Sequence, residues 1–135
     1  MALVVIDTDI ASQLFRGELS ESLLDRLAGH ELAVTFVTVG EAVYGARHKR
    51  WGARRTAILE QFYRHGFWLV PARGQQMRAV ARTWGGLRAD AEQRGFTVPV
   101  NDAWIAACCL TFRHPLATLN RKHFEPLSIV GLELL

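Results

Sequence analysis

Cysteine is scarce in this chain, and the cysteines that occur do not form a framework. The two cysteines, Cys108 and Cys109, are adjacent inside a predicted helix, where neighbouring side chains point in different directions. Neither a disulfide framework nor a zinc site fits this arrangement, because a zinc site requires two further ligands at suitable spacing. We therefore expect two reduced thiols in the hydrophobic core.

Long hydrophobic runs and secretion signals are absent as well. No apolar run approaches the roughly 20 residues that span a membrane, and the first residues lack the basic start and cleavage site of a secretory signal. The five histidines are scattered, and no two are spaced four residues apart, as a metal-binding pair on one helix face would be. These absences predict a cytosolic protein that does not contact a membrane.

The composition is that of a folded domain with a mildly basic surface. The 135 residues are half hydrophobic and carry a net charge of +3, which predicts one domain over residues 1–135 with a single core. Basic residues gather at 47–50, at Arg54-Arg55 and at Arg121-Lys122-His123. Such clusters suit a polyanion such as a nucleic acid, although cations are also favourable at solvated helix ends.

Apolar runs alternate with helical periodicity along the chain. The predicted strands are 3–6, 33–37, 67–70 and 116–119, with a further edge strand at 128–134. The predicted helices are 9–16, 20–29, 38–47, 52–65, 74–94 and 101–113. The pair Gly85-Gly86 allows a kink in the longest of them. Strands that alternate with helices predict an α/β fold, in which helices cover both faces of a parallel sheet.

Four polar residues stand where predicted strands end or helices begin. They are Asp7, Glu41, Asp102 and Asn120. Because ligands bind outside the carboxyl ends of the strands in an open α/β sheet, we expect these residues to share one rim. Two carboxylates about 5 Å apart repel by roughly 3 kcal/mol at an effective dielectric near 20. A divalent cation relieves that repulsion, and Mg²⁺ or Mn²⁺ prefers such oxygen ligands.

Helix capping offers a different explanation for some of these residues. Thr38 and Glu41 have the spacing of a capping box, and Asp102 suits the first turn of a helix that Asn101 caps. Asp7 has the strongest case for a function, because a carboxylate at the end of a buried strand is costly without one. Local capping and a shared site therefore both stay open for Glu41 and Asp102.

The order and spacing of these segments resemble those of PIN-domain ribonucleases, in particular the VapC-type toxins of bacterial toxin–antitoxin pairs. The segments are Asp7-Thr8, Thr38-Val39-Gly40-Glu41, the helix start at 101–107 and residues 116–124. The resemblance covers essentially the whole chain, and the four segments in register are more specific than any one of them. It implies a three-layer α/β/α sandwich with a five-stranded, mainly parallel sheet, and Mg²⁺- or Mn²⁺-dependent endonucleolytic cleavage of RNA.

The resemblance and the chemistry of metal ions together imply roles for individual residues. Asp7 and Asp102 hold the ion, Glu41 ligates it or hydrogen-bonds its water, and Glu41 or Asp102 acts as general base. Asn120 stands where the family often has a fourth aspartate, and it orients water or phosphate without adding charge. Supporting residues in this interpretation are Thr8, Thr38 and Arg121. Arg121 or its neighbour Lys122 neutralises the transition state or is simply a solvated loop charge.

Two other functions fit parts of the sequence. Asp7-Thr8-Asp9 after a strand is similar to the nucleophile and acid of haloacid-dehalogenase-type phosphatases, although Ala11 departs from the threonine or valine usual there. Asn120 favours a catalytically degenerate protein that binds RNA or an antitoxin. For partners, the resemblance implies an RNA substrate, a cognate antitoxin and a homodimer. The apolar helices at 9–16 and 20–29 offer surface for association.

Overall fold

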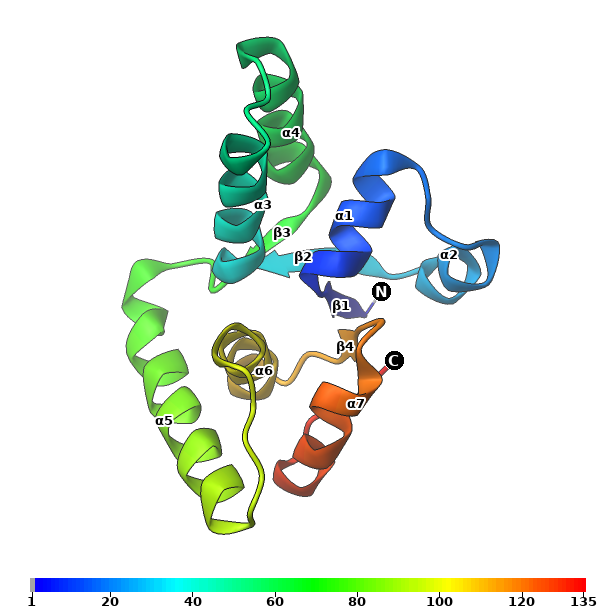
Figure 1. Ribbon diagram of the computed structural model, residues 1–135. Helices are drawn as coiled ribbons and strands as arrows, with labels where there is room; N and C mark the ends of the chain where they lie inside the picture. The colour runs from blue at the N-terminus through cyan, green and yellow to red at the C-terminus, as the bar shows by residue number, and fades with distance from the viewer. Residues whose placement is uncertain (1) are drawn as a thin grey trace.

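The computed structural model describes residues 2–135 as a sheet between two layers of helices (Figure 1). The strands are β1 (Leu3–Ile6), β2 (Glu31–Thr35), β3 (Trp68–Val70) and β4 (Leu116–Ala117). The helices are α1 (Thr8–Arg16), α2 (Glu21–Leu27), α3 (Phe36–His48), α4 (Ala53–Gly66), α5 (Met77–Gln93), α6 (Val100–Phe112) and α7 (Arg121–Phe124), with 3-10 helices η1 (Gly74–Gln76) and η2 (Glu125–Val130). The predicted α/β/α sandwich is confirmed, with four strands across these residues instead of five.

The sheet is parallel throughout, with the strand order β3-β2-β1-β4. Val5 of β1 pairs with Ala33 of β2 on one side and with Leu116 of β4 on the other. Parallel neighbours require long crossover connections, and the helices supply them. β1 lies between two other strands, so its carboxyl end is flanked by those of β2 and β4.

The two faces of the sheet bury alternate residues of the same strands. Val4 and Ile6 of β1 pack with Ile10 on one face, whereas Val5 packs in the cluster of Ile105 on the other. In Figure 1, α1 to α4 lie on the first side of the sheet and α5 to α7 on the second. Because both faces are covered, the strands are continuous apolar runs and do not alternate with polar residues.

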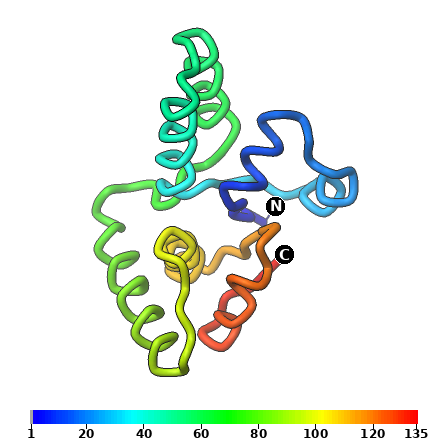
Figure 2. The backbone as a smooth tube through the Cα atoms, viewed as in Figure 1, coloured from blue at the N-terminus to red at the C-terminus, as the bar shows by residue number. Residues whose placement is uncertain are grey.

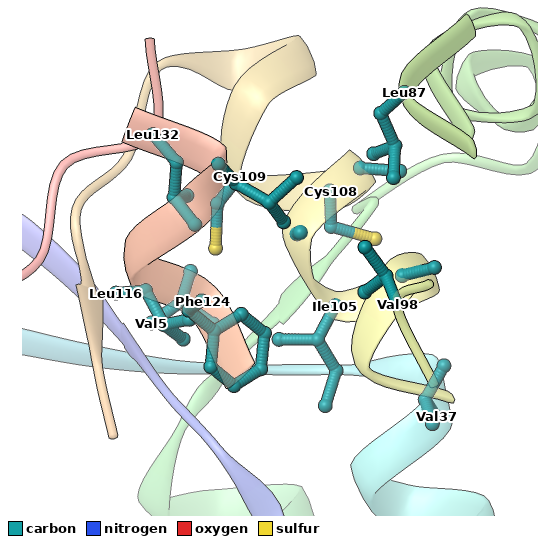
Figure 3. Close-up of a cluster of buried hydrophobic side chains, with 14 of the residues drawn as sticks. Val5, Val37, Leu87, Val98, Ile105, Cys108, Cys109, Leu116, Phe124 and Leu132 are labelled. Carbon is teal, nitrogen blue, oxygen red and sulfur yellow. The ribbon is translucent and has the colours of Figure 1, made fainter. Parts of the chain in front are cut away.

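The cluster beneath α5 and α6 contains both cysteines, and Figure 3 shows how they point. The Sγ of Cys108 points toward Leu87 and Val98, and that of Cys109 toward Leu132. Both cysteines are free and buried, and burial raises the pKa of Cys108 to about 12. The predicted pair of core thiols is confirmed, and both thiols are neutral at physiological pH.

The predicted edge strand at 128–134 is wrong. Residues Glu125–Val130 form η2, which has Pro126 in its first turn and ends at Gly131 with φ 100°. Leu127 and Leu132 are both buried in the same cluster. In an extended strand, residues five apart point to opposite faces, so the turn-like path is what buries both. Strand-like pairing of this segment is limited to one parallel bridge between Leu116 and Leu134. The two ends of the described chain lie close together (Figure 2).

The start of α3 also differs from the prediction. β2 ends at Thr35 and α3 begins at Phe36, so Thr38 lies within the helix and the predicted capping box is wrong. The ring of Phe36 packs edge-on against Trp104 at 5.9 Å between centroids. This contact with α6 sets the helix start earlier than the local sequence pattern does, because tertiary packing overrides local preference.

Other boundaries follow the sequence more closely. Gly17 ends α1 with φ 69°, and the Ser20 hydroxyl caps α2 by accepting from the amide of Leu23 at 3.2 Å. The glycine pair lies inside one continuous helix, α5. Asn101 does not cap α6, because Pro99 occupies the cap position. Over the described chain, no helix combines the length and apolarity needed to cross a membrane.

Candidate active site

The starts of α1, α3 and α6 gather at the carboxyl edge of the sheet, near the centre of Figure 1. β1 runs into α1 and β2 into α3, while α6 leads back into β4. This topology brings remote residues to one edge. They are Asp7 after β1, Glu41 on α3, Asp102 in the first turn of α6, and Thr118 and Asn120 after β4.

Asp7 is tightly held at this edge. Its Oδ1 accepts a hydrogen bond from the amide of Ile10 at 3.0 Å, which caps α1, and its Oδ2 accepts from the hydroxyl of Thr118 at 2.5 Å. The residue is only 4% exposed. Each carboxylate oxygen has acceptor capacity beyond one hydrogen bond, so Asp7 can cap the helix and bind a cation at the same time.

The surroundings of Asp7 disfavour its charge. Burial raises the pKa of Asp7, the hydrogen bonds from Thr118 and Ile10 oppose that rise, and the negative charges of Asp9 and Asp102 add to it. A buried carboxylate that two other carboxylates repel is stabilised when a positive charge binds beside it. Of the carboxylates expected at this rim, Asp102 thus acts electrostatically on Asp7, as does the neighbouring Asp9.

Glu41 is positioned by two neutral donors. Its Oε1 accepts from the hydroxyl of Thr8 at 2.6 Å, and its Oε2 accepts from the side-chain amide of Asn101 at 3.3 Å. Thr8 also lies 3.0 Å from the hydroxyl of the buried Thr38. These contacts join the starts of α1, α3 and α6. The predicted supporting residues Thr8 and Thr38 thus form a hydroxyl pair behind Glu41.

Asp102 and Asn120 contact His123 and Asp9, respectively. Oδ2 of Asp102 lies 2.9 Å from Nδ1 of His123, at the exposed rim of the site. The side-chain amide of Asn120 donates to Oδ2 of Asp9 at 2.8 Å. Arg121 pairs with Glu125 and donates to the carbonyl of Leu135, so its guanidinium is engaged beside the carboxyl edge.

The donor set fits a hard divalent cation. Asp7, Glu41 and Asp102 offer the carboxylate oxygens that Mg²⁺ and Mn²⁺ prefer, and the repulsion around Asp7 is the kind that a cation relieves. Among residues 2–135, no three carboxylate, histidine or cysteine side chains are gathered into a ready-made metal cluster. The carboxylates are held by hydrogen bonds instead, so metal binding requires some of these side chains to turn.

The sequence did not indicate which residues hold the acidic side chains in place. In the structure these partners include Thr118, His123 and Asn101. Thr118 directly follows β4, and its hydroxyl also accepts from the backbone amide of Asn120 at 2.9 Å. It therefore holds both Asp7 and the backbone of residues 118–120 in place. A hydroxyl residue two positions before the candidate Asn120 was the available signal. Its partner Asp7 lies 111 residues away, which local patterns do not indicate.

Comparison with known proteins identifies the family. The model of the PIN domain matches residues 4–127. The chain belongs to the PIN-domain family. A search of curated protein sequences finds no match, so the family assignment rests on this family model. Family membership agrees with the resemblance carried by the four sequence segments.

Solved structures share the fold of this PIN domain over nearly its whole length. The VapBC2 complex of Rickettsia felis, bound to a promoter DNA fragment, contains a chain that is 20% identical, with 98% of this chain and 97% of that chain covered and a TM-score of 0.80. The DNA-bound VapBC complex of Salmonella typhimurium gives 21% identity, 100% and 98% coverage and a TM-score of 0.80. VapBC-5 of Mycobacterium tuberculosis gives 25% identity, full coverage of both chains and a TM-score of 0.68.

Proposed function

We propose that this PIN-domain protein is a metal-dependent endoribonuclease of the VapC toxin type. The observation that carries the proposal is the buried carboxylate of Asp7, whose pKa is raised by burial and by the charges of Asp9 and Asp102. Keeping repelling carboxylates at one edge of a sheet is unfavourable for folding alone. The arrangement is useful where a divalent cation and a phosphodiester meet.

In this proposal Asp7 and Asp102 hold Mg²⁺ or Mn²⁺, and Glu41 is a third ligand or hydrogen-bonds a water beside it. When bound, the cation supplies Lewis acidity to the phosphodiester and makes water more acidic. Thr118 and the Ile10 amide fix the direction of the Asp7 carboxylate.

Glu41 and Asp102 are the two candidates for general base. Thr8 holds Oε1 of Glu41 through a short hydrogen bond, whereas Asn101 contacts Oε2 at 3.3 Å. Oε2 is therefore the less strongly engaged oxygen and the one that we assign to a proton from the attacking water. Asn120 is directed to Asp9 and is assigned a role in orienting that side chain and the phosphate.

The phosphatase alternative has little support. The family model that matches the chain is that of the PIN domain, and the carboxylate of Asp9, which that mechanism requires as an acid, is bound to Asn120. A catalytically degenerate protein that binds RNA differs from a nuclease in its products, so experiment separates the two.

The direct test incubates the purified protein, free of any partner, with total cellular RNA and Mg²⁺ or Mn²⁺. Discrete RNA fragments are expected, and they should disappear with EDTA and with Asp7→Asn. Asp90→Asn removes an exposed carboxylate of α5 and is the matched control, so it should cleave like the wild type. Intact RNA in a sample whose metal binding is confirmed by calorimetry would favour the degenerate protein, and phosphate released from small phosphoesters would favour the phosphatase.

We further propose an antitoxin partner and a homodimer. The similar structures from Rickettsia felis and Salmonella typhimurium are VapBC complexes bound to DNA, which supports a protein partner here. On α1 and α2, Ile10, Leu23 and Leu27 are buried in the core, whereas Leu24 of α2 is exposed and available for such a contact. A depression between α3 and α4, lined by side chains that include Val43 and Phe67, offers further apolar surface.

The oligomeric state is tested by light scattering coupled to gel filtration. The chain has a mass of 15.2 kDa, so a homodimer elutes with twice that mass, and a mass near that of one chain would contradict the dimer. Co-purification with the product of a neighbouring reading frame, and the loss of RNA cleavage in that complex, are expected for an antitoxin.

A further inference from the structure

An open depression of about 770 Å³ adjoins Glu41, on the surface formed by α3 and α6. Gly40, Glu41 and Tyr44 line it from α3, and Asn101 and Trp104 line it from α6. The depression therefore shares Glu41 and Asn101 with the candidate active site.

Tyr44 stands at the rim of this depression with much of its ring uncovered. It follows Glu41 by three residues on α3, so both side chains lie on the same helix face. The residue is 68% exposed, and its ring packs parallel to that of His48, with 5.6 Å between centroids. The exposed part of the ring can take a further flat ring in stacking contact.

The other aromatic wall is rigid. Trp104 stacks on Trp84 at 4.5 Å with an interplanar angle of 10°, and Phe36 packs against it edge-on. The guanidinium of Arg88 lies 4.9 Å from the ring centroid of Trp84 and closes the outer side of the stack. Trp104 is thus held in place from behind while it lines the depression in front.

Gly40 keeps the space between these walls open. Glycine is a poor helix former, yet Gly40 lies within α3. A methyl group built at this position meets no other atom within 4 Å. The surface over the helix backbone at Gly40 is therefore open, as it is at Gly86 of α5.

We infer that this depression binds one unpaired base of the RNA strand, next to the scissile phosphate. The inference rests on the proposed ribonuclease function and adds a subsite to it. Stacking suits a base because every base has an aromatic face, and it demands a single strand because paired bases are covered by their neighbours. The exposed basic residues Arg47 and Lys49 follow Tyr44 at the end of α3 and match the charge of the next phosphates.

The test measures RNA binding without cleavage. The probe is a fluorescein-labelled single-stranded octaribonucleotide of random sequence, titrated with the full chain in EDTA and followed by fluorescence anisotropy. Tyr44→Ala removes the exposed ring, and Gly40→Leu fills the depression. Each is expected to weaken binding roughly tenfold, the scale of one lost base stack.

Two matched variants provide the controls. Tyr44→Phe keeps an aromatic ring and should bind like the wild type. Gly86→Leu makes the same change as Gly40→Leu at an exposed helical glycine of α5 that is equally free of neighbours within 4 Å, and it should also leave binding unchanged. Thermal melting of all four variants verifies that each is folded.

The outcomes separate this inference from the proposed function. Wild-type binding by both Tyr44→Ala and Gly40→Leu would overturn the base subsite while RNA fragmentation still supports the nuclease. Equal weakening by Gly40→Leu and Gly86→Leu would overturn it as well, because the effect would then belong to helix composition. A wild-type protein that neither binds nor fragments RNA would overturn the subsite together with the nuclease function.

Discussion

The hydroxyl of Thr118 lies 2.5 Å from Oδ2 of Asp7, and this contact joins the ends of the neighbouring strands β4 and β1. The hydrogen bond stabilises the charged form of Asp7, whereas burial destabilises it. The balance between the hydrogen bond and burial determines how readily this carboxylate binds a cation near neutral pH. Several properties of the protein should therefore respond to changes at this one contact.

Thr118→Val is expected to raise the pKa of Asp7 further, because it removes the hydrogen bond that opposes the effect of burial. Protons then compete with Mn²⁺ up to a higher pH. The pH at which Mn²⁺ binding reaches half its maximum, measured by calorimetry, should move upward relative to the wild type. An unchanged midpoint would show that Thr118 does not control the charge of Asp7.

Asp7→Asn should remove cleavage and stabilise the fold in EDTA. The substitution deletes a buried charge but keeps an amide oxygen that accepts from the Ile10 amide. At pH 7.5 the melting temperature should rise by roughly 3 °C, equivalent to about 1 kcal/mol for a domain of this size. Differential scanning calorimetry checks this, and a lower melting temperature would mean that the charged form is preferred in the folded protein.

The stability of the wild type should depend on pH through Asp7. Its pKa in the folded protein lies above the ordinary value of 3.8, so the folded state binds the proton more tightly than the unfolded state. This stabilisation is complete below pH 3.8 and is lost as pH rises through the folded pKa. Relative to Asp7→Asn, the free energy of unfolding of the wild type should fall over that range in urea titrations without metal.

Thr8→Val should impair cleavage with little loss of stability. It deletes the hydroxyl that donates to Glu41 at 2.6 Å, so the carboxylate is less well oriented and the rate should fall roughly tenfold. Thr83→Val is the matched control, because it breaks a contact of 2.8 Å with Thr111 between α5 and α6, away from the carboxylates. Equal rates of RNA cleavage by Thr8→Val and Thr83→Val would contradict a positioning role for Thr8.

Ile105→Ala should cost about 2–5 kcal/mol in the free energy of unfolding, the usual range for such a truncation. Ile105 is 1% exposed in the main cluster, and the substitution leaves a cavity under the sheet. Ile58→Ala on α4 is the control, because that side chain is 54% exposed and should cost well under 1 kcal/mol. Urea denaturation measures both.

The sequence was enough to predict which residues lie at the carboxyl edge of the sheet, because few chain topologies are compatible with its alternation of strands and helices. Buried apolar runs such as 3–6, separated by helical segments, are typical of parallel strands, and parallel strands place all their carboxyl ends together. That rule was sufficient to bring Asp7 and Asp102 to one edge. It did not predict the partners of the side chains, because the bonds from Thr118 to Asp7 and from Asn120 to Asp9 each span 111 residues.

Local patterns failed where tertiary contacts competed with them. Thr38 and Glu41 have the spacing of a capping box, yet the packing of Phe36 on Trp104 starts α3 earlier. The apolar residues near the end of the chain have the composition of a strand. There the burial of both Leu127 and Leu132 favours a 3-10 turn. In both segments the deciding contact is with a residue distant in sequence.

The amide of Ile10 donates to the same carboxylate that is proposed to meet the cation. Its ¹⁵N and proton chemical shifts therefore depend on the electron density of Asp7 Oδ1. In a ¹⁵N-labelled sample, this one backbone resonance should move during a Mg²⁺ titration and again as the carboxylate takes up a proton. The first turn of α1 thus provides an intrinsic NMR probe of the site, one that needs no substrate and no knowledge of which RNA is cut.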